Sequence, residues 1–263
     1  MSIYLQIILL FTVGIIAGFM NVMAGGGSTL TLPTLIFLGL DSALANGTNR
    51  VAIIIQNIFA IYSFKREKYQ KFKLSLKMSL FTLPGAVAGA IVAVKIGDQT
   101  FQTILGIIMI GIIISMVIPR SKIEYSNSDS GKISPWVYVS MLFIGFYGGF
   151  IQVGVGFIIM AALHYLMKLN LVYVNMHKVF IVFIYTIPAI IIFIYTNNIN
   201  WELGLSLAAG NALGGWWAAK FSVKKGEGII KIILIIAVLI MSQKLYGVLM
   251  FRMFLKAWFI SAS

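Results

Sequence analysis

Cysteine and charged residues are scarce in this sequence, and each shortage excludes several classes of protein. None of the 263 residues is cysteine, which excludes disulfide bonds, thiolate nucleophiles and metal sites held by cysteine. Only 10% of the residues are charged, whereas soluble domains carry about 25%. A secreted domain, a cytosolic enzyme and a disordered regulator are therefore excluded.

Acidic residues are the rarest charged type, and they stand outside the apolar runs. Asp and Glu total 7, and Asp41, Asp98, Glu202 and Glu227 lie at the ends of such runs. A catalytic carboxylate pair, a carboxylate proton relay and a cation pathway lined by acids therefore lack the residues they need. Because no nucleophile–base pair or metal-binding cluster is present either, we expect no enzyme activity, no metal and no cofactor.

Hydrophobic residues make up 60% of the chain, and the mean hydropathy is +0.98. A soluble fold could not bury so much apolar surface, so lipid must surround most of the chain. Two short apolar runs, Gly27–Leu40 and Gly156–Leu169, each follow a glycine-rich break. The longer runs, which approach or reach the length that crosses about 30 Å of hydrocarbon, are Ile3–Val22, Thr48–Phe64, Leu74–Val94, Phe101–Ile118, Trp136–Ile151, Val174–Tyr195, Trp201–Ala219 and Ile229–Tyr246.

The predicted fold is an all-α polytopic membrane protein with about 8–10 membrane segments. We expect two structural repeats, each with a glycine-broken short or half helix. The predicted parts are residues 1–120 as the first repeat, 121–134 as a polar linker, 135–247 as the second repeat and 248–263 as a tail.

A shift of 129 residues aligns the two halves. It places Gly25–Gly27 on Gly154–Gly156 and Asn46 on Asn175. Few residues are identical between the two halves, but glycine breaks, small residues and apolar runs follow in the same order in both. Duplicated halves are a recurring plan in transporters, with the substrate site at the interface between the repeats.

The basic residues indicate how the repeats are oriented. The net charge is +13, and basic residues are densest in the loops Lys65–Lys77 and Lys220–Lys231, whose counterparts 196–200 and 95–98 carry no excess of positive charge. If both basic loops are cytoplasmic, equivalent loops lie on opposite faces and the repeats are inverted. Parallel halves with re-entrant short segments are the alternative. Without a basic amphipathic helix or a soluble domain, the partners expected for these charges are membrane lipids and not nucleic acid.

The glycine triplet Gly25–Gly27 is the first candidate for a binding site. Three glycines inside lipid interrupt a helix and free backbone N–H groups. A helix that restarts at Ser28 would point its positive end at the break, where an anion can bind. Close packing of helices is the alternative reading. Recurrence at Gly154 and Gly156 favours the binding site.

Two cations form the second candidate. Arg50 ends the run Asn46-Gly47-Thr48-Asn49-Arg50, and Lys178 follows His177 in the other half. One cation per half fits a two-sided cradle for an oxyanion, with Asn46 and Asn175 as side-chain donors near mid-membrane. The alternative is that both cations extend to lipid phosphates at the interface.

His164 and His177 could shuttle protons near neutral pH, although a structural hydrogen bond is the commoner role of a polar side chain in a membrane helix. The complete set of predicted substrate-binding residues is Gly25, Gly26, Gly27, Ser28, Thr29, Asn46, Thr48, Asn49, Arg50, Gly154, Gly156, Asn175, His177 and Lys178.

At these residues the chain resembles a known family. The stretch from Ala24 to Pro33, Ala-Gly-Gly-Gly-Ser-Thr-Leu-Thr-Leu-Pro, and the following Asn-Gly-Thr-Asn-Arg resemble the TauE/SafE-type sulfite exporters, a family of membrane permeases. The stretches 175–180 and 210–220 are similar too. In the second half Val155 replaces the middle glycine, and Gln152 precedes the motif. The resemblance implies transport of sulfite, sulfonates or related organic anions.

These observations together predict a secondary transporter for a small organic or inorganic oxyanion, with a sulfur-containing anion such as sulfite or a sulfonate as its substrate. We expect alternating access in a multi-pass protein of the cell (plasma) inner membrane. An anion channel is the alternative. The expected partners are the anionic substrate and membrane lipids, and a homo-oligomer is left open.

Overall fold

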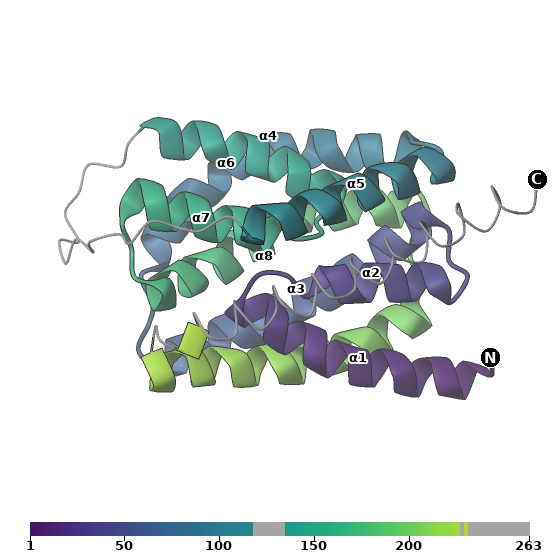
Figure 1. Cartoon of the computed structure of the whole chain (residues 1–263), viewed down its shortest axis with the longest axis horizontal. Helices are drawn as coiled ribbons and strands as arrows, with labels where there is room; N and C mark the ends of the chain where they lie inside the picture. The colour runs from purple at the N-terminus through teal and green to yellow at the C-terminus, as the bar shows by residue number, and fades with distance from the viewer. Residues whose placement is uncertain (118–134, 227–228, 231–263) are drawn as a thin grey trace, which may run out of the picture.

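Helices form nearly all of the chain that the structure describes. The computed structural model describes residues 1–117, 135–226 and 229–230, and these ranges contain no strand. Residues 201–226 form a final helical stretch. The helices that precede it in chain order (Figure 1) are α1 (Ile3–Met23), α2 (Ser28–Phe37), α3 (Ser42–Arg66), α4 (Phe72–Lys95), α5 (Asp98–Val117), α6 (Pro135–Phe150), α7 (Val155–Met167) and α8 (Leu171–Tyr195).

The two short apolar runs correspond to the short helices α2 and α7. They contain 10 and 13 residues, or about 15 and 20 Å at 1.5 Å per residue. Neither length alone crosses about 30 Å of hydrocarbon. The predicted linker 121–134, the tail 248–263 and nearly all of the run 229–246 lie outside the described residues.

Two predicted helix starts are wrong. Helix α3 begins at Ser42 and not at Thr48, and α8 begins at Leu171 and not at Val174. Asn46 therefore lies inside α3 instead of preceding it, and Asn175 lies in the second turn of α8. A search for apolar runs misses the start of α3 because its first turns carry the polar residues Ser42 and Asn46, which are buried inside the protein. The first turn of α8, from Leu171 to Val174, is apolar.

The distribution of polar and apolar side chains fits a lipid environment. Within the described ranges, α1, α4 and α8 are long and apolar enough to cross a membrane. Large apolar side chains point outward, with Ile8 62% and Phe143 68% exposed, whereas Asn46 and Arg50 are fully buried. A protein dissolved in lipid places its polar groups against one another in this way.

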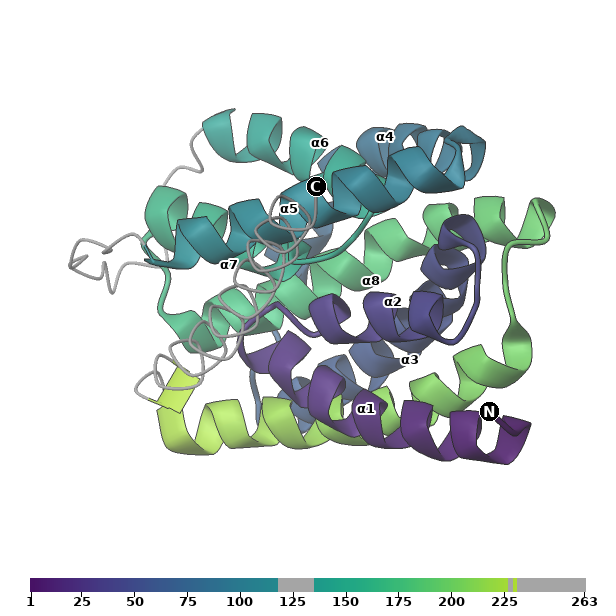
Figure 2. The ribbon, with the colours of Figure 1, turned by 45° about the vertical axis from the view of Figure 1, so that its right-hand side comes forward.

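Glycine allows two pairs of helices to approach closely. A Cβ atom added at Gly85 on α4 or at Gly149 on α6 would collide with the backbone of the other helix. Gly14 on α1 and Gly210 in the 201–226 helix meet in the same manner. Figure 2 shows both pairs, α4 beside α6 at the top and α1 beside the yellow-green helix at the bottom. This is the small-residue packing expected of membrane helices.

The order of elements repeats along the chain. A helix, a glycine break, a short helix and a 25-residue helix follow one another in α1–α3 and again in α6–α8. The loop between α3 and α4 lies beside the start of α8, where the rings of Tyr69 and Tyr173 are 5.0 Å apart. Its counterpart 196–200 lies at the opposite end, where Asn200 N donates to Thr48 Oγ1. Inverted halves require this placement of loops, and the inversion across a membrane stays a prediction.

Candidate substrate site

The two glycine breaks lie against each other in the centre of the protein. Gly25 has a φ of +90° and Gly154 a φ of +71°, a left-handed conformation that any side chain would strain. A Cβ atom at Gly25 would lie 2.6 Å from Phe157 N, and one at Gly156 would lie 2.6 Å from Gly25 O. The halves therefore meet backbone to backbone at the breaks.

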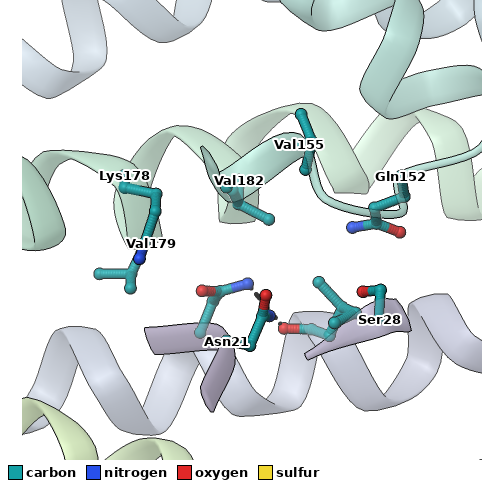
Figure 3. A pocket seen from close by; sticks show the side chains of 10 residues that line it. Asn21, Ser28, Gln152, Val155, Lys178, Val179 and Val182 are labelled. Atoms are coloured by element: carbon teal, nitrogen blue, oxygen red, sulfur yellow. Dashed lines mark hydrogen bonds between the residues drawn. The ribbon is translucent and has the colours of Figure 1, made fainter. Parts of the chain in front are cut away.

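A small cavity lies beside this contact (Figure 3). It has room for about one water molecule, so the described conformation is closed around it. Lys178 and Gln152 reach into it from one side, and Asn21 and Ser28 face them from the other. The residues that line it are Asn21, Ser28, Ile53, Asn57, Gln152, Val155, Gly156, Lys178, Val179 and Val182.

Lys178 brings a buried cation to the cavity wall from α8. Its side chain is 2% exposed. The Nζ atom donates to Val22 O at 2.7 Å and to Asn175 Oδ1 at 2.9 Å, and it lies 3.4 Å from Met160 Sδ. The alternative that Lys178 extends to lipid phosphates is therefore wrong. Because a thioether sulfur is a weak acceptor, the third N–H is the one that a ligand can take.

Arg50 does not line the cavity. Its Nη1 donates to Gly148 O at 3.1 Å and its Nη2 to Gly149 O at 2.5 Å, both in the last turn of α6. The guanidinium also lies 4.8 Å from the centre of the Phe193 ring. The predicted lipid-facing role is wrong for this residue as well, because it is fully buried. Its contacts are those of a helix cap.

Asn46 and Asn175 occupy matching places in the two halves. Asn46 Nδ2 donates to Phe150 O at 2.7 Å at the end of α6, and Asn175 Nδ2 donates to Met23 O at 3.3 Å at the end of α1. Each Nδ2 uses one of its two N–H groups in this contact, and neither asparagine lines the cavity, so the role as substrate donors stays a prediction. Each asparagine satisfies a helix-end carbonyl of the other half.

Thr48 and Asn49 contact other parts of the chain and not the cavity. The Thr48 hydroxyl accepts a hydrogen bond from Asn200 N at 2.9 Å. Asn49 Oδ1 accepts one from Thr31 Oγ1 at 2.7 Å, which ties α3 to α2. Both side chains are fully buried. The structure therefore places these two predicted site residues in the supporting framework.

The remaining residues of the first break hold α2 in place. Thr29 Oγ1 donates to Gly26 O at 2.6 Å. A Cβ atom at Gly27 would lie 2.6 Å from Asn21 Cβ, and one at Gly26 would lie 2.5 Å from the tip of the Phe157 ring. Of the first-half residues in the predicted set, Ser28 alone lines the cavity, and Gly156 and Lys178 line it from the second half.

The two histidines make hydrogen bonds within the helix bundle. His177 Nδ1 is 2.7 Å from Ser75 Oγ on α4, and both side chains are buried. His164 Nδ1 is 2.9 Å from Leu169 O. Neither residue lines the cavity. These contacts fit the structural reading better than a proton shuttle at the candidate site.

The predicted set of site residues omits three polar residues of the cavity wall: Asn21, Asn57 and Gln152. Asn21 and Asn57 interrupt the predicted runs 3–22 and 48–64, and a polar residue inside an apolar run was the available signal. Gln152 stood out only as a departure from the glycine motif. No spacing rule in the sequence brings these three side chains together.

The electrostatics of the cavity favour a negative ligand. In the described part of the chain, no carboxylate contacts Lys178 or Arg50. Helices α2 and α7 both begin at the cavity, since Ser28 and Val155 are their first residues and both line it. Helix N-termini carry partial positive charge and unpaired N–H groups. One ammonium group and two helix N-termini therefore converge here.

Comparison with known proteins gives a consistent result. A family model described as "Sulfite exporter TauE/SafE" matches residues 10–245. A "probable membrane transporter protein ORF9" of Sinorhizobium is 27% identical over 238 residues, which cover 90% of each chain. A "probable membrane transporter protein" of Haemophilus influenzae is 26% identical, covering 90% of this chain and 93% of the relative. The Escherichia coli "probable membrane transporter protein YfcA" is 27% identical, covering 90% and 88%. No solved structure matches the chain.

Proposed function

The chain belongs to the TauE/SafE sulfite exporter family of membrane transporters, and on that basis we propose that it carries a small oxyanion by alternating access. Sulfur-containing anions, sulfite or a sulfonate, are the proposed substrates. The proposed location is the inner (plasma) membrane of the cell, which the chain crosses several times. Membrane lipids are its proposed surroundings, with anionic headgroups facing the basic loops.

The observation that carries this proposal is the environment of Lys178. Its ammonium group is buried beside the cavity without a contacting carboxylate in the described residues. A buried charge is costly unless it is paired. Two carbonyl or amide oxygens offset this cost only in part, and an anion in the cavity would supply the missing charge. The nearby helix N-termini would bind its remaining oxygens.

The closed cavity supports a carrier over a channel. In the described residues the contact between Gly25 and Gly156 closes the site, and the cavity beside it is too small for an oxyanion. The proposed cycle therefore needs a rearrangement of the two halves that opens the site first to one side and then to the other. Export of an anion from a negative-inside cell gains about 2.3 kcal/mol per charge at 100 mV.

Two measurements test the function. The first is thermal unfolding of the purified protein with sulfite, sulfate, thiosulfate, sulfoacetate and simple carboxylates, because a ligand that binds the folded state raises its stability. We expect stabilisation by at least one sulfur oxyanion and none by matched cations. The second is counterflow in proteoliposomes loaded with that anion. Trans-stimulated exchange supports a carrier, whereas large single-channel currents without exchange would establish the channel.

A further inference from the structure

The cavity wall carries hydrogen-bond acceptors as well as a cation. An oxyanion offers only acceptors of its own, so every protein acceptor that faces it must find a donor elsewhere. Two carboxamides of the cavity wall, those of Gln152 and Asn57, contribute acceptor oxygens of this kind.

The orientation of the Gln152 carboxamide follows from its neighbour Thr186. The Thr186 hydroxyl donates its single hydrogen to Val182 O at 2.6 Å, so towards Gln152 it can only accept. The Gln152 atom 3.4 Å from Thr186 Oγ1 must therefore be Nε2. The remaining atom, Oε1, is buried without a hydrogen-bond partner in the described residues, and the residue is 1% exposed.

Gln152 is also held in an uncommon backbone conformation. Its φ is +61°, in the left-handed region that non-glycine residues rarely adopt. Residues in such conformations cluster at binding sites, where the surrounding structure enforces them. Here the conformation directs the carboxamide across the cavity towards Ser28 (Figure 3).

Asn57 adds a second acceptor by the same logic. Its Nδ2 donates to Ile53 O at 2.8 Å, one turn earlier in α3. A carbonyl oxygen cannot donate, so the amide cannot be reversed, and Oδ1 is the acceptor that remains beside the second N–H of Nδ2. The wall thus places two carboxamide oxygens beside the Lys178 ammonium group, the Ser28 hydroxyl and the second N–H of each carboxamide. Of the two oxygens, Gln152 Oε1 is the one that is buried without a partner in the described residues.

We propose that the site selects oxyanions that carry a hydrogen-bond donor of their own, with the anionic group on Lys178 and the hydroxyl of the ligand on Gln152 Oε1. This inference rests on the proposed function and narrows its substrate class to hydroxylated or singly protonated oxyanions. An anion without a donor leaves a buried acceptor unsatisfied, which is the basis of strong rejection in polar sites. The site therefore discriminates by a hydroxyl group as well as by charge.

Two sulfonates of nearly equal size test the inference. 2-Hydroxyethanesulfonate and propane-1-sulfonate differ by a hydroxyl in place of a methyl group. Their dissociation constants are measured by titration calorimetry on the purified full chain. We expect the hydroxylated anion to bind about tenfold more tightly, the ratio that one unsatisfied buried acceptor produces. Equal affinities would show that a protein donor, such as the neighbouring Tyr185 hydroxyl, satisfies Gln152, and would overturn the inference.

The variant Gln152→Met assigns the effect to its residue. It keeps the length of the side chain and removes both amide atoms. We expect the tenfold ratio to fall to about one, because the variant removes the acceptor that the hydroxylated anion satisfies and that propane-1-sulfonate leaves unsatisfied. A ratio that survives in Gln152→Met and disappears in Asn57→Leu overturns the role of Gln152. If no sulfonate and no sulfite binds the wild-type protein, the proposed function fails as well. If both sulfonates bind equally tightly, the proposed function stands and only the selectivity for a hydroxyl group fails.

Discussion

The Lys178 ammonium group on α8 lies 2.7 Å from the carbonyl oxygen of Val22 in the last turn of α1. Arg50 on α3 makes the corresponding contacts with Gly148 O and Gly149 O at the end of α6. The last carbonyls of a helix lack intrahelical partners and carry partial negative charge, so a cation stabilises them. Each half thus supplies the cationic cap for the broken helix of the other half. Only Lys178 also reaches the cavity.

Lys178→Gln tests whether the charge at the cavity binds the anion. Glutamine can still donate towards Val22 O, but it has no charge for an oxyanion. We expect the affinity for the stabilising sulfur anion to fall at least about tenfold, because hydrogen bonds with charged groups are worth about 1.5–3 kcal/mol. Calorimetric titration and uptake into proteoliposomes measure the loss. Lys178→Met is the control that removes the cap and the charge together. Unchanged transport by a monodisperse Lys178→Gln protein would contradict the role.

Arg50→Gln tests whether Arg50 stabilises the fold without binding the anion. Arg50 satisfies two carbonyls of α6 and does not line the cavity. We expect the variant to lower the free energy of unfolding by about 3 kcal/mol, since the shorter, neutral side chain cannot reach both buried carbonyls as the guanidinium does. Thermal unfolding in detergent measures this loss, and the anion affinity of the folded fraction should stay within about threefold. A larger loss of affinity than of stability would place Arg50 in the binding site.

The sequence was sufficient to predict the fold class because composition alone identifies lipid as the solvent. The two short helices were predictable too, since Gly25–Gly27 and Gly154–Gly156 interrupt apolar runs. The starts of α3 and α8 were not. Asn46 lowers the local hydropathy near the start of α3. Nothing in the segments of Asn46 and Lys178 shows that their partners are carbonyls more than 100 residues away in the chain.

The site was predictable only in part, for the same reason. A glycine break and a nearby cation are local patterns, so Ser28, Gly156 and Lys178 could be proposed from the sequence. Whether Arg50 or Lys178 faces the cavity depends on how the halves pack. The assignment of Gln152 depends on a hydrogen bond of Thr186, which no sequence pattern encodes.

Alanine at Gly25 and at Gly26 should have different consequences. Gly25 has a φ of +90° and faces the backbone of Gly156, so Gly25→Ala meets strain and collision that no side chain can relieve. A Cβ atom at Gly26 meets only the tip of the Phe157 ring. We expect Gly25→Ala to reduce the yield of monodisperse protein strongly. Gly26→Ala should lose stability that the double variant Gly26→Ala with Phe157→Leu recovers, as thermal unfolding will show. Absence of rescue would refute the contact with Phe157 as the cause.

Cysteine labelling tests the inverted arrangement of the halves, and the absence of native cysteine makes every introduced thiol specific. Ser75 and Ser222 lie in the basic segments but are fully buried, so Gln70→Cys and Lys224→Cys, at exposed positions, are the better reporters. Gln99→Cys and Asn197→Cys report on the equivalent loops. The positive-inside rule places both basic loops in the cytoplasm. An impermeant maleimide added to whole cells should therefore label positions 99 and 197 and should leave 70 and 224 unlabelled until the cells are lysed. Labelling of just one of positions 70 and 224 in intact cells would instead require parallel halves, because equivalent loops would then share a face of the membrane.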